Sequence, residues 1–473
     1  MRSKSLPADP CTLSAQELAR LYREKRLSPV DAVAACLERV ARYNPTLNAF
    51  VLLNAEAALQ AAAQAAAGFA RGDAMPPLAG IPVSVKDNIE TAGLRSTMGS
   101  PLFRDYVPEQ DSGVAAALRR SGAIILGKTN TSAFGWAGVT DNLLFGPTRN
   151  PWNPALTPGG SSGGAAVATA TGMVPISLGT DGGGSLRAPA AFTGMIGFKP
   201  SHGRLPDSPA HPHWLIQHYG PVARTVADVA LFLDAVAGPD PADPHSLPRY
   251  NGSYLADLQN PPEKPRVLFT TQLGWTFDVE TEITAACQAI VTELAQSGWA
   301  VEQRDLAWSD PAPFANVIQM EGFRQRLAPF MDRTDEIEDG LRAMVETAQA
   351  LPPHAFYDAY LARNRWCEQP ARLFEDIDLL ITPTTATLPF EIGRWAPATI
   401  NGREIPRGGA SPFLRAFNLS GNPAISMPIA QTANGLPIGL QIVGPRHADA
   451  LVLAAASVIE KLRPLKLWTP EAD

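Results

Sequence analysis

The chain has 473 residues, of which 45% are hydrophobic and 18% are charged, and its formal net charge is -7. This composition is that of an ordinary globular protein with a large core, and it excludes a disordered or fibrous chain. The acidic balance provides no basic stripe for a phosphate backbone, so nucleic-acid binding is disfavoured.

The first residues carry positive charges but no apolar run behind them, which argues against a signal peptide. No stretch reaches the ~18 uninterrupted apolar residues that a membrane helix needs. The four cysteines, Cys11, Cys36, Cys287 and Cys367, are scattered and have no CxxC pair or histidine in ligand spacing. We therefore expect a cytoplasmic protein with no membrane contact, disulfide framework or metal.

The first ~70 residues are predicted to be mainly helical. Ser14 and Glu17 have the spacing of a capping box, and Ser28-Pro29 has the pattern that opens a helix. The Ala-rich stretch 55–70 contains polar residues at intervals, which favours a water-exposed helix over a membrane span.

After this part, short apolar runs alternate with helical segments and Gly/Pro loops. The runs predicted as strands are residues 81–85, 123–126, 176–178, 266–270 and 378–382. Near the C-terminus, residues 424–429 and 436–443 flank Asn434-Gly435, a strong signal for two neighbouring strands. This alternation favours an α/β sheet with helices on its faces. The Pro-, Asp- and Asn-rich segment 239–265 marks a long surface connection rather than a clear domain boundary.

Two serines are bracketed by glycines, in Gly159-Gly160-Ser161-Ser162-Gly163-Gly164 and in Gly182-Gly183-Gly184-Ser185. Glycine allows unusual dihedrals and close backbone approach, so both segments suggest a backbone that lies near a reacting group. A third element is Lys86. The apolar residues Ile81, Val83 and Val85 alternate with Ser84 and Lys86, so a half-buried strand would place Lys86 opposite its hydrophobic face. A lysine and two serines can supply a base, a relay and a nucleophile.

Two motif matches have simpler structural explanations. Residues 122–129 satisfy the Walker A pattern, but their Ala-Ile-Ile-Leu centre predicts a buried strand, and Lys128, a second candidate base, is expected to be mainly structural. Residues 159–163 satisfy the nucleophile-elbow pattern, but a Pro-rich loop precedes them instead of a strand. An α/β-hydrolase-type esterase would also need a histidine base, and four of the seven histidines fall in the loop-like segment 201–220. Loop histidines are the simpler explanation.

These segments resemble the amidase signature family. The resemblance runs in order through residues 159–168, 179–190 and 197–200, and it is supported by the Lys86 segment and by residues 127–130 and 435–441. The region from Arg266 to Arg372 is the least diagnostic. The length and order of the pattern argue against a chance match.

The resemblance implies one large α/β domain, residues 1–473, with a mixed, mostly parallel central β-sheet covered by helices on both faces. Its parts are a helical N-terminal part (1–70), a signature core with the catalytic residues (75–240), a variable substrate-side region (265–375), and C-terminal strands and a helix of the same sheet (376–473).

The resemblance also implies three catalytic roles: Ser185 is the nucleophile, Ser161 is a bridging serine preceded by a cis peptide bond, and Lys86 is the general base. A serine hydroxyl is a weak nucleophile until a base removes its proton. A lysine with a pKa of ~10.4 is charged at neutral pH, so burial must lower its pKa by roughly three units before it can accept that proton.

The loop before the nucleophile is expected to bind the substrate carbonyl oxygen. The resemblance implies an oxyanion hole made by the amides of Gly182, Gly183, Gly184 and Ser185. The sequence departs from the family pattern at Gly182, where a larger residue commonly sits, and this change is expected to widen or loosen the pocket floor. Asp181 and Arg187 are expected to hold the loop as structural partners.

The resemblance implies hydrolysis of a carbon-nitrogen bond through an acyl-enzyme, without metal or organic cofactor, and some members of the family also accept esters or carbamates. An apolar pocket is expected from six side chains, namely Met98, Phe134, Trp136, Trp214, Ile216 and Tyr219. We therefore expect a small aromatic amide or carbamate as the substrate, and a monomer or homodimer.

Two other functions carry the same signature. A glutamine amidotransferase subunit would pass ammonia to a transfer-RNA-linked substrate and would need partner chains, so hydrolysis of aryl amides by the purified chain would count against it. A non-catalytic binding module would be expected to lack one of the three catalytic residues. All three are present, which ranks the binding module last.

Overall fold

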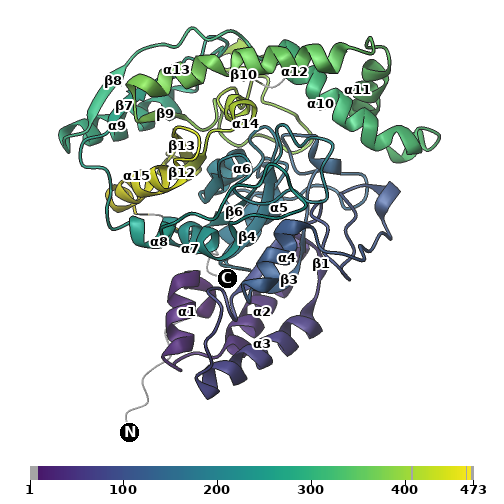
Figure 1. Cartoon of the computed structure of the whole chain (residues 1–473), viewed down its shortest axis with the longest axis vertical. Coiled ribbons are helices and arrows are strands. Elements are labelled where there is room, and N and C mark those ends of the chain that lie inside the picture. The colour runs from purple at the N-terminus through teal and green to yellow at the C-terminus, as the bar shows by residue number, and fades with distance from the viewer. Residues whose placement is uncertain (1–8, 406–408, 465, 470–473) are drawn as a thin grey trace.

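The computed structural model describes residues 9–405, 409–464 and 466–469. Figure 1 shows the N-terminal helices α1 (Ala15–Arg23), α2 (Pro29–Leu47) and α3 (Ala55–Arg71) at one end of the long axis and the sheet in the middle. An arch of helices crosses the other end, formed by α10 (Ala312–Leu327), α11 (Asp339–Gln349), α12 (Ala355–Trp366) and α13 (Glu368–Asp376).

An eleven-stranded sheet runs through the described part of the chain, in the order β1-β3-β2-β4-β6-β5-β12-β13-β9-β7-β8. Its strands are β1 (Phe50–Leu53), β2 (Pro82–Lys86), β3 (Ile124–Thr129), β4 (Ile176–Asp181), β5 (Ile196–Lys199), β6 (His218–Ala223), β7 (Arg266–Phe269), β8 (Ala300–Gln303), β9 (Leu379–Pro383), β12 (Ala424–Gln431) and β13 (Pro437–Val443). A separate two-stranded ribbon joins β10 (Thr399–Ile400) and β11 (Arg403–Glu404).

The prediction of an α/β fold with a mixed sheet is confirmed, and the direction of its strands changes across the sheet. β2 pairs in parallel with β3 and β4, and β7 pairs in parallel with β8 and β9. Between these flanks, β6, β5, β12 and β13 pair antiparallel with their neighbours. The parallel character expected for most of the sheet therefore holds in its two flanks. The middle contains the β12–β13 hairpin, which its Asn-Gly turn dictates.

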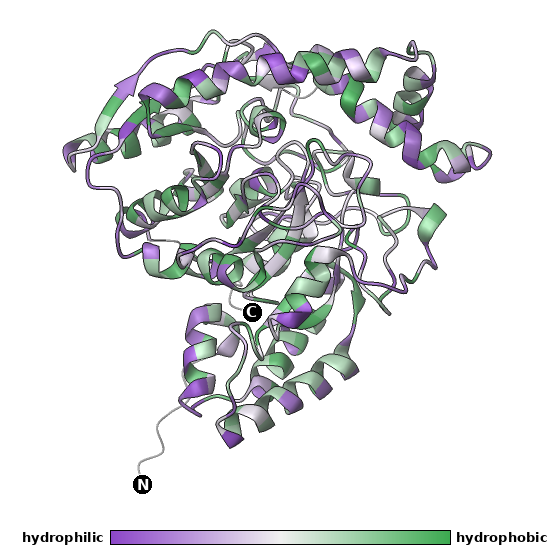
Figure 2. Ribbon diagram, in the orientation of Figure 1, coloured by the Kyte–Doolittle hydropathy of each residue, from purple (hydrophilic) through white to green (hydrophobic). Residues whose placement is uncertain are grey.

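Helices cover the sheet in two groups. α5 (Gly163–Ala170) and α6 (Arg187–Thr193) pack against each other; α5 also packs on β2 and β4, and α6 on β5, β12 and β13. α7 (Val226–Val236), α9 (Thr281–Gln296) and α15 (Asp449–Leu462) form a second group, with α4 (Gly113–Arg120) and α8 (Tyr254–Asp257) packed on α7. In Figure 2, α15 is mainly hydrophobic, whereas the outer helix α13 alternates hydrophilic and hydrophobic residues.

The predicted helical N-terminal part is confirmed, with one strand added. Ser14 and Glu17 form the capping box of α1, and Ser28 caps α2 through the amide of Val30. The strand β1 lies between α2 and α3 and pairs antiparallel with β3 at the edge of the sheet. Its four residues were too short a run for the sequence pattern to separate from the surrounding helices.

β2 differs from the half-buried strand that the alternation predicted, because all five of its residues are buried. The predicted side assignment is correct. Ser84 faces α5, since its hydroxyl donates to Ser177 Oγ (2.7 Å), which in turn donates to Ala165 O of α5 (3.0 Å). Lys86 lies two residues further along and therefore shares this face. The prediction of partial exposure was wrong because the strand is central in a sheet covered on both faces.

Within the described residues, no helix is both long enough and apolar enough to cross a membrane.

Candidate active site

Lys86 ends β2 and meets three hydroxyl groups. Its Nζ lies 2.7 Å from Ser161 Oγ, 2.8 Å from Ser162 Oγ and 2.8 Å from Thr180 Oγ1. The parallel pairing of β2 with β4, in the register Val85 with Leu178, brings the carboxyl ends of both strands together and explains why Thr180 is near. A lysine predicted from strand alternation thus contacts one of the two serines predicted from the glycine pattern.

Burial favours the uncharged form of Lys86. The side chain is fully buried, and this loss of water lowers the pKa of its amine well below the ordinary value, although the charge of Asp181 opposes the shift. A hydroxyl can donate to a neutral amine as well as accept from it. The three neighbours therefore suit a lysine that gains and loses a proton.

Two other buried lysines have different partners. Lys128 donates to the carbonyl of Ile89 and lies 2.8 Å from Ser96 Oγ, and burial lowers the pKa of its amine to about 8. Lys199 donates to the carbonyls of Asn422 and Pro200. Carbonyl oxygens only accept hydrogen bonds, so these two lysines hold loops in place and are poorly suited to accept a proton from a hydroxyl. The structural role expected for Lys128 fits this geometry.

Ser161 lies in a tightly held loop just before α5. The Gly160-Ser161 peptide bond is cis, as the resemblance implied. Thr140 Oγ1 donates to Gly159 O (2.9 Å) and accepts from the amide of Gly163 (2.9 Å), so one side chain holds both sides of the bond. A Cβ at position 160 would lie 2.3 Å from the backbone carbon of Val139, so this position requires glycine.

Ser185 lies beside this loop and lines a cavity of about 780 Å³. The amide of Ser162 donates to the carbonyl of Ser185 (3.1 Å), which holds the two serine segments against each other. Among the described residues, the Ser185 hydroxyl has no hydrogen-bond partner, and the side chain is only partly buried. The cavity also reaches Ser161 and Thr180. The structure therefore brings Lys86, Ser161 and Ser185 to one place.

The amide groups before Ser185 correct one part of the predicted oxyanion hole. The amide of Gly184 donates to Asp181 Oδ1 (2.6 Å), so it is not free to bind a substrate oxygen. The amides of Gly182, Gly183 and Ser185 have no protein acceptor in the described structure, and all three residues line the cavity. Sequence reasoning could not separate these amides, because the carboxylate that takes one of them belongs to the same loop.

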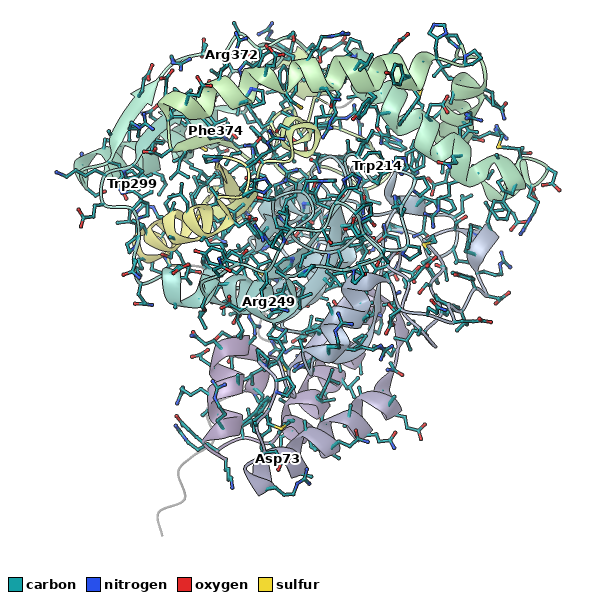
Figure 3. All side chains as sticks on the ribbon, viewed as in Figure 1. Asp73, Trp214, Arg249, Trp299, Arg372 and Phe374 are labelled. Atoms are coloured by element: carbon teal, nitrogen blue, oxygen red, sulfur yellow. The ribbon has the colours of Figure 1, made fainter. Side chains whose placement is uncertain are left out.

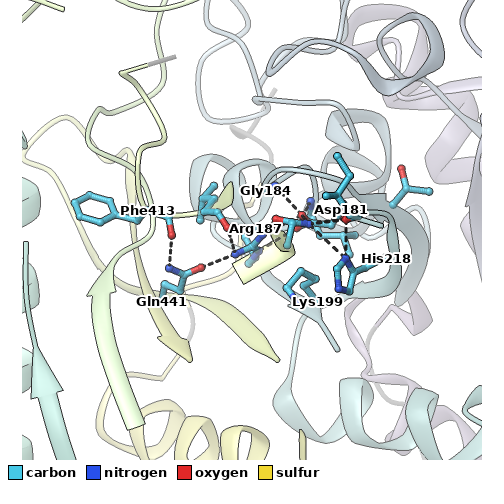
Figure 4. A network of polar contacts seen from close by, with 12 residues as sticks. Asp181, Gly184, Arg187, Lys199, His218, Phe413 and Gln441 are labelled. Atoms are coloured by element: carbon cyan, nitrogen blue, oxygen red, sulfur yellow. Dashed lines mark hydrogen bonds and ion pairs between the residues drawn. The ribbon is translucent and has the colours of Figure 1, made fainter. Parts of the chain in front are cut away.

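Asp181 and Arg187 form a buried ion pair that fixes the loop (Figure 4). The Asp181 carboxylate accepts from both Nε (3.0 Å) and Nη2 (2.9 Å) of Arg187, from Asn418 (2.8 Å) and from two loop amides. Burial alone would raise the pKa of Asp181, but the Arg187 charge outweighs burial and lowers it below the ordinary value. Arg187 also donates to Gln441 (2.8 Å) of β13. Both residues lie where the expected structural role requires.

A glycine comparison tests how tightly the loop is built. Gly184 has φ +116°, and an added Cβ would lie 2.4 Å from Leu414 Cδ1, whereas a Cβ at Gly182 would lie 3.4 Å from its nearest neighbour, Gln217 Oε1. Gly184→Ala is therefore expected to destabilise the protein by about 1–3 kcal/mol and to lower kcat at least about tenfold. Gly182→Ala is expected to change the free energy of unfolding by less than about 1 kcal/mol. Chemical denaturation and kcat measurements compare the two, and equal destabilisation would contradict this account of the loop.

Three of the six predicted pocket residues, Phe134, Trp136 and Ile216, line the cavity. Gly135 lies between the first two, and a Cβ there would be 3.2 Å from Ser161 Oγ, so the aromatic pair flanks the serine relay directly. Met98 is buried behind Phe134 and Trp136 in the same hydrophobic cluster and supports the wall from outside the cavity.

The other two predicted pocket residues lie elsewhere. Trp214, labelled in Figure 3, stacks on His245 with ring centroids 4.7 Å apart and lines a separate cavity of about 140 Å³. Tyr219 lines that same second cavity and donates to Asp207 Oδ1 (2.9 Å). The prediction that they face the main cavity was wrong. The loop before β6 directs Ile216 to one side and Trp214 to the other.

Several site residues escaped sequence reasoning. Thr180 and Ser162 complete the shell around Lys86, and both occur in the segments that carry the family resemblance, so their neighbourhood was visible although their role was not. Most remaining wall residues come from distant segments: Trp275, Phe277, Asn316, Gln319, Met320, Phe323, Met344, Phe390, Trp395 and Arg415. No local pattern marks them, because only the folded chain assembles this wall.

The histidines are not placed to activate a serine. His211 and His213 line the cavity, and burial lowers the pKa of both imidazoles, that of His213 to about 4. His213 bonds the carbonyl of Gln319 (3.0 Å), and His211 lies 3.2 Å from Arg326 Nη1. In the described structure no histidine bonds Ser161 or Ser185, which argues against the histidine-based esterase.

Comparison with known proteins gives a consistent result. Residues 31–453 match the family model described as Amidase. The chain is 34% identical to an acylamidase of Rhodococcus erythropolis over 96% of both chains, and 34% identical to a glutamyl-tRNA(Gln) amidotransferase subunit of Moorella thermoacetica over 97% of this chain and 98% of that one. Among solved structures, a bacterial aryl acylamidase of the amidase signature family superposes with a TM-score of 0.89 at 30% identity, covering 96% of both chains.

Proposed function

We propose that this chain, which belongs to the amidase signature family and hydrolyses amide bonds, acts on aryl amides with Ser185 as its nucleophile. The observation that carries the proposal is the contact between the buried Lys86 amine and Ser161 Oγ (2.7 Å) beside the cavity that Ser185 lines. An amine kept neutral by burial accepts a proton through a hydroxyl relay, which is the role that a histidine has in other serine hydrolases.

The proposed reaction has two acyl-transfer steps. Ser185 Oγ attacks the substrate carbonyl carbon while its proton passes to Ser161, whose own proton passes to the Lys86 amine. The amides of Gly182, Gly183 and Ser185 bind the developing oxyanion, and fixed donors of this kind contribute several kcal/mol to the transition state. The proton then returns along the relay to the leaving nitrogen. A water molecule repeats the sequence on the acyl-enzyme and frees Ser185.

The proposal of an aryl leaving group rests on the residues around the relay. The departing nitrogen must receive its proton from Ser161, so the amine part of the substrate lies on that side of Ser185. Phe134 and Trp136 flank Ser161 there, and Trp395 packs against Trp136 with ring centroids 4.5 Å apart. Aromatic walls stack favourably on an aromatic ring. Acylamidase relatives, one of them an aryl acylamidase, support the same substrate class.

The second candidate is the transferring subunit, which the 34% identity to the Moorella thermoacetica chain favours. The two functions differ in what the purified chain does alone. We expect it to hydrolyse para-nitroacetanilide without any partner, with a kcat/KM at least about tenfold above that for glutamine. Glutaminase activity that appears only with added partner chains, and no anilide hydrolysis, would support the transferring subunit instead. Carbamate and ester turnover, a monomeric or homodimeric state, and a cytoplasmic location stay predictions.

The pH dependence of kcat/KM is expected to follow Lys86. Since only the neutral amine accepts the proton, activity rises with pH through the pKa of Lys86 in the folded protein and is lost below it. Burial places this pKa well below its ordinary value, so the acidic limb of the profile should lie well below pH 10.5. A steady-state profile with para-nitroacetanilide checks this. Activity that is constant over the acidic range down to the unfolding of the protein would contradict the role of Lys86.

A further inference from the structure

A cationic side chain lines the cavity opposite the relay. Arg415, the first residue of α14 (Arg415–Ser420), lines the cavity, and its Cγ lies 3.8 Å from the Cβ position of residue 183 in the oxyanion loop. Its guanidinium donates to Asn316 Oδ1 (2.6 Å), Ala315 O (2.6 Å) and Gln319 Oε1 (3.1 Å), which all belong to α10. These three acceptors are neutral.

The bonding of Arg415 is incomplete compared with that of the nearby Arg187. Arg187 is fully buried and its charge is balanced by the bidentate Asp181 carboxylate. A guanidinium has five N–H groups, and the bonds of Arg415 leave Nε and one Nη1 proton without a protein acceptor in the described structure. Burial lowers the pKa of Arg415 only to about 10, so it is charged at neutral pH. A cation with spare donors in a substrate cavity suits an anion.

The position of Arg415 relative to Ser161 assigns the anion to one part of the substrate. A carbonyl carbon bound at Ser185 carries three substituents: the oxygen in the amide pocket, the leaving nitrogen toward Ser161, and the acyl chain. Ser161 lies beside Gly135, whereas Arg415 reaches the glycine loop at Gly183 from α10 and α14. The acyl chain is therefore the substituent directed toward Arg415.

We propose, as a refinement that rests on the proposed function, that the acyl part of the preferred substrate ends in a carboxylate bound by Arg415. The substrate class is the aryl half-amide of a short dicarboxylic acid. Hydrolysis of such a compound consumes one water and releases an arylamine and a dicarboxylate. Among the described residues, the cavity wall holds one aspartate, Asp310, which accepts from the amide of Ala312 (2.8 Å) and forms no ion pair with Arg415.

The first test compares two substrates with one leaving group, glutaryl-para-nitroanilide and its methyl ester. The ester removes the negative charge and keeps the chain and the chromophore. For the unmodified protein, kcat/KM is expected to be about tenfold to hundredfold higher for the acid, the range for a charge-assisted hydrogen bond. In Arg415→Met this ratio should fall to about one, and Arg415→Lys should restore part of it. Because the ratio is taken within each variant, a general loss of activity does not affect it.

Arg324 offers a matched control. It lies on α10, pairs with Glu321 (2.7 Å) and lines a different cavity. Arg324→Met removes the same charge from the same region and should leave the acid-to-ester ratio as it is. If Arg415 only braces α14 against α10, then Arg415→Met would lower stability but keep the ratio, and this result would overturn the proposal. A ratio of one or less in the unmodified protein would overturn it as well.

A binding measurement separates this proposal from the proposed function. In Ser185→Ala, isothermal titration with N-phenylglutaramic acid and with its methyl ester reports binding without turnover. We expect the acid to bind about tenfold more tightly and expect this preference to vanish in Ser185→Ala/Arg415→Met. If the acid is bound in this way and no anilide is cleaved by the intact chain, the proposed function fails and the anion site stands. If anilides are cleaved and neither preference appears, the anion site fails and the proposed function stands.

Discussion

Lys86→Met is expected to lower kcat for para-nitroacetanilide by at least about 10³-fold, since removal of a catalytic base leaves only the contribution of the amide pocket and substrate binding. Methionine has nearly the length of the lysine stem and no proton to exchange. The three hydroxyls around Nζ, those of Ser161, Ser162 and Thr180, lose one partner but can bond one another or water. Initial rates and a thermal unfolding curve measure the two properties on the same sample.

Lys128→Met is the matched control for this substitution. Lys128 is also fully buried, but its amine binds the carbonyl of Ile89 and the hydroxyl of Ser96 instead of a serine at the cavity. We expect this variant to lose stability, because two buried acceptors are left unpaired, and to keep most of its kcat in the folded fraction. A Lys86→Met protein that is folded and retains a tenth or more of the activity would contradict the assignment of the base.

Arg187→Met is expected to lower the free energy of unfolding by about 3–5 kcal/mol, the usual cost of leaving one charge of a buried pair alone. Asp181 would remain fully buried with only Asn418 and the loop amides as partners. Arg187 also joins the loop to Gln441 and to the carbonyl of Leu414, so its loss removes contacts between distant segments. Urea denaturation measures the change.

An exposed pair provides the comparison for Arg187. Arg266 and Asp378 form an ion pair at 2.8 Å, with half of the arginine side chain in water (53% exposed). Exposed pairs contribute about 0–1 kcal/mol, so Arg266→Met should change the free energy of unfolding by no more than that. Similar losses for both variants would show that the buried pair does not hold the catalytic loop in the way described.

The sequence predicted the elements that depend on local patterns. Alternation of Val83 and Val85 with Lys86 located β2 and the correct face of the lysine, and the Asn434-Gly435 turn located the β12–β13 hairpin. The antiparallel middle of the sheet was not predictable, because the neighbours of β5 and β6 are set by long-range packing. The full burial of β2 has the same origin, since α5 covers it only after folding.

The candidate site divides in a similar way. Glycine patterns located the segments of Ser161 and Ser185, because close backbone approach restricts residue types locally. The engagement of Gly184 by Asp181 depends on a loop conformation that composition does not encode. The cavity wall was half predicted, and Phe323 and Arg415 could not be, because they lie more than a hundred residues from Ser185 along the chain.

The most direct test of the central claim is to trap the acyl-enzyme on Ser185. Rapid acid quenching during turnover of a para-nitrophenyl ester, followed by mass spectrometry of the intact protein and its peptides, locates the attached acyl group. We predict one acyl group per chain on the peptide that contains Ser185, and none in Ser185→Ala. An acyl group carried by another residue during turnover, or an active Ser185→Ala protein, would contradict the account.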